Sequence, residues 1–194
     1  MKHRENIKVW DPLVRIFHWS LVFCFLLAFI TEGDVIDVHS WAGYSILILL
    51  LIRLIWGFIG PRYARFSDFV RSPSLIMRYL KDTLMLRARR YIGHNPLGGA
   101  MVLLLFGSLI LTTVTGMAVY GATDNAGPLA AWFGQTSESG AELFEEVHEF
   151  FANFTLFLVV IHVGGVIFES LVHRENLIRA MLDGYKSKQP TQTP

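Results

Sequence analysis

Four long apolar stretches constrain the fold of this chain more than any other feature. They cover about residues 13–31, 40–59, 97–120 and 148–172. Helices of about 20 residues cross a hydrocarbon layer about 30 Å thick, and a helix satisfies its backbone hydrogen bonds internally, as lipid demands. A chain of 194 residues that is 53% hydrophobic is also too apolar for a soluble domain. The sequence therefore predicts an all-α integral membrane four-helix bundle, with one domain over residues 1–186.

The lysines and arginines lie on one side of this predicted bundle. They precede or enter the first span, occupy the segment that joins the second span to the third, and follow the fourth span. The other two connections contain no lysine or arginine and are acidic. Basic residues beside membrane spans mark the cytoplasmic side. Both termini and the middle connection are therefore predicted to be cytoplasmic, and the outer face is predicted to be anionic.

Two polar segments outside the spans have the pattern of short interfacial helices. Ser72 and Pro73 open the first, LIMRYLKDTLMLRARR, whose arginines suit anionic headgroups. The second, HRENLIRAML, follows the fourth span. Residues 187–194 include two prolines and are predicted to be a disordered tail.

Four histidines lie near the ends of these spans. His148 and His162 are fourteen positions apart on the fourth span, so a helix places them about 21 Å apart along its axis and within about 40° of one face. His18 lies near the cytoplasmic edge of the first span, and His39 opens the second span at the outer edge. Depth therefore pairs His18 with His162 and His39 with His148. A histidine inside a lipid-spanning segment needs a partner, and a metal is a strong one.

Two histidines at each depth favour haem over a bare metal ion. Zinc or non-haem iron needs more histidine, cysteine or carboxylate ligands than each depth supplies. Haem provides four nitrogens in its plane and needs two axial side chains. The single cysteine, Cys24, lies within the first span, so the chain has no CxxCH attachment motif and the haems would be b-type. Filled axial positions favour outer-sphere electron transfer. The alternative is a cofactor-free membrane scaffold whose histidines cap helices or bond to carbonyls.

Polar residues near the cytoplasmic edge suggest further contacts. His94, in GHNPLGG, lies at the start of the third span, where it can contact a haem propionate or a quinone, or cap the helix. Arg53 lies inside the second span and Glu169 near the end of the fourth, so we expect a mutual ion pair, or snorkelling of each side chain to the interface. His3 and His173 are expected at the surface.

Segments spread over nearly the whole chain resemble the bacterial cytochrome b561 and nickel-iron hydrogenase cytochrome b superfamily. They are VWDPLVRIFHW, DVHSWAG, RLIWGFIGPRYARF, YIGHNP, TGMAVY, VHEFFANFTLFLVVIHV and MLDGYKSK. The resemblance implies a di-haem four-helix subunit of the bacterial inner membrane that exchanges electrons with the quinone pool. It also implies that His18, His39, His148 and His162 are the axial ligands, two to each of two b-type haems.

On this basis we expect the electron-transfer subunit of an oxidoreductase system, which moves electrons between quinone and a periplasmic redox partner. Hydrogenase subunits of the superfamily usually have a longer first outer loop, and the outer face here is acidic, so a c-type cytochrome is favoured over a hydrogenase as partner. A superoxide:ubiquinone oxidoreductase is the alternative, although it would need an outer surface that attracts an anion. No nucleic-acid partner is expected.

Overall fold

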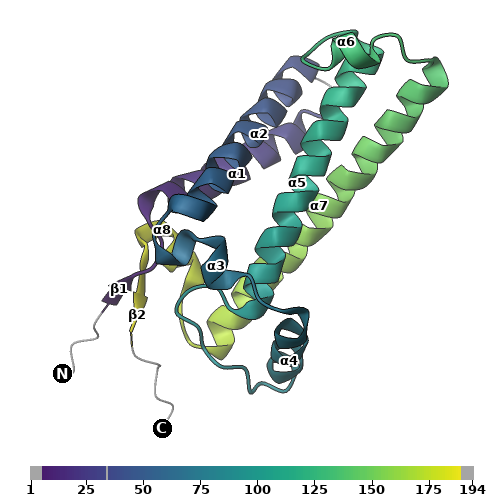
Figure 1. The fold of residues 1–194 in the computed structure, drawn as a ribbon. Helices are drawn as coiled ribbons and strands as arrows, with labels where there is room; N and C mark the ends of the chain where they lie inside the picture. Colours follow the sequence, from purple (N-terminus) through teal and green to yellow (C-terminus); the bar gives the residue numbers. More distant parts are fainter. Residues whose placement is uncertain (1–5, 34, 189–194) are drawn as a thin grey trace. The chain divides into compact units, whose positions relative to one another are not determined.

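Four long helices dominate the structure, a computed structural model that describes residues 6–33 and 35–188 (Figure 1). They are α1 (Pro12–Ile30), α2 (Ile36–Ile59), α5 (Pro96–Thr123) and α7 (Glu138–Val172). All four are long and apolar enough to cross a membrane. Many of their large apolar side chains face outward, as lipid contact requires. The predicted all-α integral membrane four-helix bundle is confirmed.

The largest difference from the predicted spans is at the start of α7. The helix has 35 residues and begins at Glu138, whereas the apolar stretch begins about His148. The intervening ESGAELFEEV is polar and acidic, so hydropathy alone assigns it to a connection. Its first turn contains Glu138, and a carboxylate at a helix N-terminus interacts favourably with the helix dipole.

Short helices occupy the connections, with α4 (Pro73–Leu84) and α8 (Leu177–Asp183) in the two segments predicted to be helical. Proline suits the first turn of α4, because its missing N–H would be unsatisfied there. The helix ends at Leu84, so the arginines that follow it lie beyond its end. The remaining short helices are η1 (Arg62–Ala64), α3 (Phe66–Phe69) and α6 (Ala130–Phe133).

A small antiparallel sheet joins the two ends of the described chain, which the sequence did not predict. Strand β1 (Asn6–Lys8) pairs with β2 (Tyr185–Ser187), with Ile7 opposite Lys186 (Figure 1). The Gly184 carbonyl also accepts hydrogen bonds from the backbone N–H groups of Val9 and Trp10, at 2.8 and 3.1 Å. Of the predicted disordered tail, Ser187 belongs to β2, and residues 189–194 lie outside the described residues.

The chain divides into two compact units. Unit 1 consists of Met1–His18, Arg53–Leu103 and Val160–Pro194, and unit 2 of Trp19–Ile52 and Leu104–Val159. All 17 lysines and arginines belong to unit 1, together with seven of the 16 acidic residues. The other nine acidic residues belong to unit 2. Each long helix has one end in each unit.

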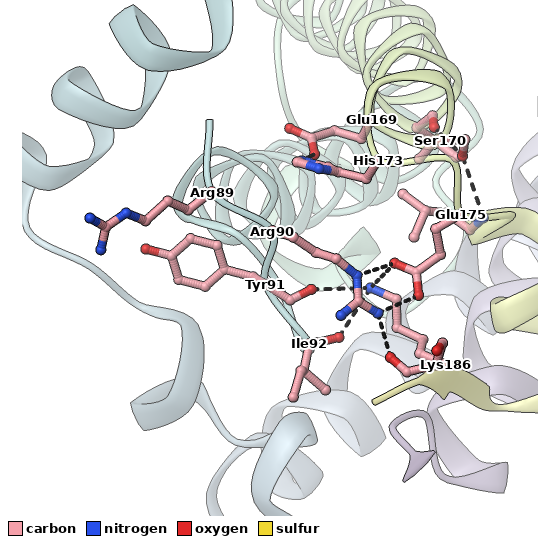
Figure 2. A network of polar contacts seen from close by, with 12 residues as sticks. Arg89, Arg90, Tyr91, Ile92, Glu169, Ser170, His173, Glu175 and Lys186 are labelled. Atoms are coloured by element: carbon pink, nitrogen blue, oxygen red, sulfur yellow. Dashed lines mark hydrogen bonds and ion pairs between the residues drawn. The ribbon is translucent and has the colours of Figure 1, made fainter. Parts of the chain in front are cut away.

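An ion-pair network in unit 1 joins the loop before α5, the connection between α7 and α8, and strand β2 (Figure 2). Arg90 donates to both carboxylate oxygens of Glu175, at 2.7 and 3.2 Å, and to the carbonyl of Ser187. The ammonium of Lys186 lies 3.4 Å from Glu175 and donates to the Ile92 carbonyl at 3.1 Å. The Lys186 residue is only 6% exposed. Because a buried cation is costly without a partner, Glu175 is central to this network.

Candidate haem sites

Unit 2 brings together the first predicted histidine pair. His39 near the start of α2 and His148 on α7 have ring centroids 6.1 Å apart, with an angle of 88° between the ring planes. If iron–nitrogen bonds are close to the roughly 2.0–2.1 Å of zinc–imidazole bonds, an iron atom held between two imidazoles would place the ring centroids roughly 6–6.5 Å apart. The separation in unit 2 suits an iron atom between the rings.

Backbone carbonyls select the same tautomer for both rings. Nδ1 of His39 lies 2.9 Å from the carbonyl of Ala28, and Nδ1 of His148 lies 3.0 Å from the carbonyl of Thr112. A carbonyl only accepts, so each Nδ1 carries the proton and each Nε2 keeps its lone pair. Metal-bound histidines show this arrangement, in which the second hydrogen bond fixes the ring and increases its basicity.

A cavity of about 550 Å³ includes both imidazoles in its wall. Its volume lies within the range of about 300–1,000 Å³ that is typical of cofactor sites. Two glycines shape the space. A Cβ at Gly116 would lie 2.8 Å from Cε1 of His148, whereas a Cβ at Gly43 would meet nothing within 4 Å. The donor set, the tautomers and the cavity therefore fit a haem in unit 2.

Unit 1 brings together the second predicted pair. His18 on α1 and His162 on α7 have ring centroids 6.4 Å apart, with an angle of 51° between the ring planes. This separation also suits an iron atom between the rings. Over residues 6–33 and 35–188, no three histidine, cysteine, aspartate or glutamate side chains gather as a metal-binding group.

His94 and Arg53 are both in unit 1. The His94 ring packs between Trp10 and Phe69, with centroids 4.7 and 4.8 Å away. Burial, and then the positive charges of Arg53 and Lys186, lower the pKa of His94 to about 3, so its imidazole is neutral. Its buried Nδ1 has no hydrogen-bond partner among the described residues.

The Arg53 side chain is buried, with the residue 4% exposed. One guanidinium nitrogen donates to the carbonyl of Ala64 at 2.9 Å, and the group lies 5.4 Å from the ring centroid of Phe66. The other terminal nitrogen, Nη1, is buried and has no hydrogen-bond partner in the described part of the chain. Both Arg53 and His94 therefore retain a buried polar atom that a ligand oxygen can satisfy.

The expected ion pair between Arg53 and Glu169 is wrong. Glu169 pairs instead with His173, at 3.0 Å (Figure 2). Glu169 also accepts a hydrogen bond from the Tyr79 hydroxyl at 3.3 Å. The expectation of a surface position for His173 is also wrong, because its side chain is only 15% exposed. The four-residue spacing of Glu169 and His173 on a helix was a signal for this pair. His3 lies outside the described residues.

Sequence reasoning missed the groups that hold the ligand rings. The acceptors of Ala28 and Thr112 are backbone carbonyls, which no residue type reveals. Thr115 was also missed, although its hydroxyl lies 3.3 Å from Nδ1 of His148. Its place on α5, which is rich in hydroxyl side chains, was the available signal.

Fold and sites together define a class: four-helix membrane proteins whose paired histidines suit haem. Residues 9–184 match the model of a family described as prokaryotic cytochrome b561. The chain belongs to this family, and it is a membrane cytochrome of b type. The resemblance identified from the sequence segments is confirmed, and the family implies b-type haem.

Curated relatives cover nearly the whole chain. One from Rhizobium leguminosarum bv. viciae is 24% identical over 93% of this chain and 89% of its own length. One from Azotobacter vinelandii is 25% identical over 96% of this chain and 90% of its own length. Both are named "Probable Ni/Fe-hydrogenase B-type cytochrome subunit". A relative from Escherichia coli K12 is named "Probable Ni/Fe-hydrogenase 1 B-type cytochrome subunit". It is 25% identical over 92% of this chain and 90% of its own length. No solved structure matches the chain.

Proposed function

We propose that this cytochrome holds two b-type haems and transfers electrons between the quinone pool and a periplasmic redox partner. His39 and His148 would hold an outer haem, and His18 and His162 would hold an inner haem. The observation that carries the proposal is the facing of the His39 and His148 rings, with centroids 6.1 Å apart, in the wall of a cavity of about 550 Å³. The hydrogen bond from each Nδ1 to a backbone carbonyl leaves each Nε2 available to bind iron. Haem supplies one-electron redox chemistry at an iron whose axial positions are filled.

The distribution of charge supports an orientation with unit 1 on the cytoplasmic side of the bacterial inner membrane. All lysines and arginines belong to this unit, including those beside both described chain ends. Reporters fused after Lys188 and inserted at Ser137 test it. Alkaline phosphatase should be active only at Ser137, and a cytoplasmic reporter only after Lys188. The reverse result would overturn the orientation.

Two observations bear on the partner. The relatives are named for nickel-iron hydrogenases, which supports a hydrogenase-like enzyme. The nine acidic residues of unit 2 support a docking face rich in lysine and arginine, whether on a hydrogenase or on a c-type cytochrome. Reduction or oxidation by a true partner should slow as ionic strength rises. The same acidic residues disfavour superoxide, an anion, as the substrate.

The buried atoms of His94 and Arg53 support a site for an oxygen acceptor in unit 1, either a quinone carbonyl or a haem propionate. A quinone analogue should perturb the spectrum of the inner haem and lose this effect in Arg53→Gln. An analogue that perturbs only the outer haem would exclude a quinone here. An unchanged quinone response in the variant, together with an altered inner-haem spectrum, would assign Arg53 to the propionate.

Haem content and the reduced-minus-oxidised spectrum of the purified protein test the proposal as a whole. We expect two b haems per chain, one of them lost in His148→Ala and the other in His162→Ala. His173→Ala is a matched control, because it removes a histidine from the same chain segment without removing a proposed ligand. Unchanged spectra in both ligand variants would support the scaffold alternative and overturn the proposal.

A further inference from the structure

Three hydroxyl side chains, two of them buried and the third, that of Thr112, half-buried, form a cluster between α5 and α7 in unit 2. Oγ of Ser108 lies 2.6 Å from Oγ1 of Thr155, and Oγ1 of Thr112 lies 3.1 Å from the same atom. Thr155 is 0% exposed and Ser108 is 4% exposed. Ser108 and Thr112 are four residues apart on α5, so they share one face of that helix.

The hydrogen bonds of this cluster are complete. Thr155 donates its proton to the Phe151 carbonyl at 2.8 Å, and Thr112 donates to the Ser108 carbonyl at 2.9 Å. Ser108 can then donate to Thr155, which leaves no hydroxyl proton unused. A satisfied polar cluster away from water holds its helices in one arrangement, because any slip leaves a buried hydroxyl unpaired.

The same segment of α5 supplies the hydrogen-bond partner of a proposed haem ligand. The backbone carbonyl of Thr112 accepts the Nδ1 proton of His148 at 3.0 Å, while the Thr112 side chain contacts Thr155. His148 and Thr155 are seven residues, or about 10.5 Å, apart on α7. Two contacts two turns apart therefore fix the position of this part of α5 along α7.

We infer that Thr155, together with Ser108, is a positioning residue for the outer haem. It holds the Thr112 carbonyl at hydrogen-bond distance from His148 and thereby sets the redox potential of that haem. The inference rests on the proposed function, since it requires a haem on His39 and His148. A short hydrogen bond from Nδ1 to a carbonyl makes the imidazole a stronger electron donor to iron, which favours the ferric form. Loosening the bond should favour the ferrous form.

Redox titration of four variants tests this role. Thr155→Val removes the central hydroxyl at similar volume, Ser108→Ala removes its donor, and Thr155→Ser restores a hydroxyl. Ser45→Ala is the matched control, because the Ser45 hydroxyl donates to the Trp41 carbonyl within its own helix. The outer haem is identified as the one lost in His148→Ala.

We expect the ferric/ferrous equilibrium of the outer haem to shift toward the ferrous form by about threefold to tenfold in Thr155→Val and Ser108→Ala. A tenfold shift corresponds to about 59 mV for one electron. The low-temperature EPR signal of the ferric outer haem should move as well, because it reports the orientation of the axial rings. The inner haem, Thr155→Ser and Ser45→Ala should match the parent protein.

Several results would overturn the inference. They are an unchanged outer haem in both Thr155→Val and Ser108→Ala, equal shifts of both haems, and failure of Thr155→Ser to restore the parent potential. If Thr155→Val loses the outer haem, the test rests on Ser108→Ala. A shifted potential of the outer haem in that variant supports the inference, and an unchanged potential overturns it. Failure of the proposed function gives a different result, since His39→Ala and His148→Ala would then leave the spectrum unchanged.

Discussion

Units 1 and 2 contain similar histidine pairs in opposite surroundings. Unit 1 contains every lysine and arginine, and its segments are joined by Arg90, Glu175 and Lys186. Unit 2 contains no lysine or arginine in its sequence, and neutral hydroxyls and carbonyls join its helices. A buried charge that loses its partner strongly destabilises the fold, whereas the loss of a neutral hydroxyl hydrogen bond costs much less stability. The comparison predicts that unit 1 variants mainly change stability and that unit 2 variants mainly change the properties of a haem.

The largest expected effect is on the stability of unit 1. Glu175→Gln leaves Arg90 and the buried Lys186 without their carboxylate, which should lower the free energy of unfolding by about 3 kcal/mol or more. Thermal unfolding in detergent measures it. Arg179→Ala is the control, because it breaks an exposed pair with Asp183 and should cost less than about 1 kcal/mol. Equal losses in the two variants would contradict a central role for Glu175.

The same carboxylate predicts a pH dependence. Burial alone would raise the pKa of Glu175, but the Arg90 hydrogen bond and the charges of Lys186 and Arg90 outweigh it and lower the pKa below 4.5. A lowered pKa in the folded state stabilises the protein above the unfolded pKa, and this stabilisation is lost as the pH falls through the folded value. The stability difference between the parent and Glu175→Gln should therefore be constant near pH 7 and shrink below about pH 4.5. A constant difference throughout acidification would contradict this.

The next prediction concerns Gly116 in unit 2. A Cβ there would lie 2.8 Å from the His148 ring, so Gly116→Ala should displace the ring at a cost of about 1–3 kcal/mol. We expect an altered outer haem and a normal inner haem in the difference spectrum. Gly107→Ala, also on α5, is the matched control, because a Cβ at Gly107 meets nothing within 4 Å and this glycine is not part of the cavity wall. A change confined to the inner haem would contradict the assignment of His148.

A further prediction compares the two proposed haems directly. Unit 2 contains nine acidic residues and no lysine or arginine, whereas the 17 lysines and arginines of unit 1 exceed its seven acidic residues. Reduction adds an electron, so the outer haem should have the lower potential. A difference of about 59 mV would correspond to a tenfold difference in equilibrium constant, or about 1.4 kcal/mol. Redox titration measures both potentials. A lower potential for the inner haem would show that local contacts outweigh the overall charge.

The smallest expected effect tests a neutral contact within unit 1. The Asn176 side chain caps α8 by accepting a hydrogen bond from the Arg179 N–H at 2.7 Å. Asn176→Ala should cost about 1 kcal/mol, and Asn176→Ser should retain most of the stability. A loss as large as that of Glu175→Gln would contradict the distinction between charged and neutral contacts.

The spans and the histidine pairs could be predicted because both depend on helix geometry alone. Length and hydropathy locate four spans, and a fourteen-residue spacing places His148 and His162 on one face. The partners of His39 and His148 could not be predicted, because they are backbone carbonyls whose position depends on packing. The β1–β2 pair has three residues in each strand, too few for an alternating pattern to be recognised. The start of α7 was missed because its first ten residues are polar.

The absence of lysine and arginine from the sequence of unit 2 has a consequence for the protein in an energised membrane. Moving one elementary charge through 100 mV involves about 2.3 kcal/mol. With unit 1 on the cytoplasmic side, as proposed, an inside-negative voltage attracts its 17 cations inward and repels the nine carboxylates of unit 2 outward. Both effects favour the same orientation of the chain. The voltage that respiration generates would thus itself oppose inversion of the chain.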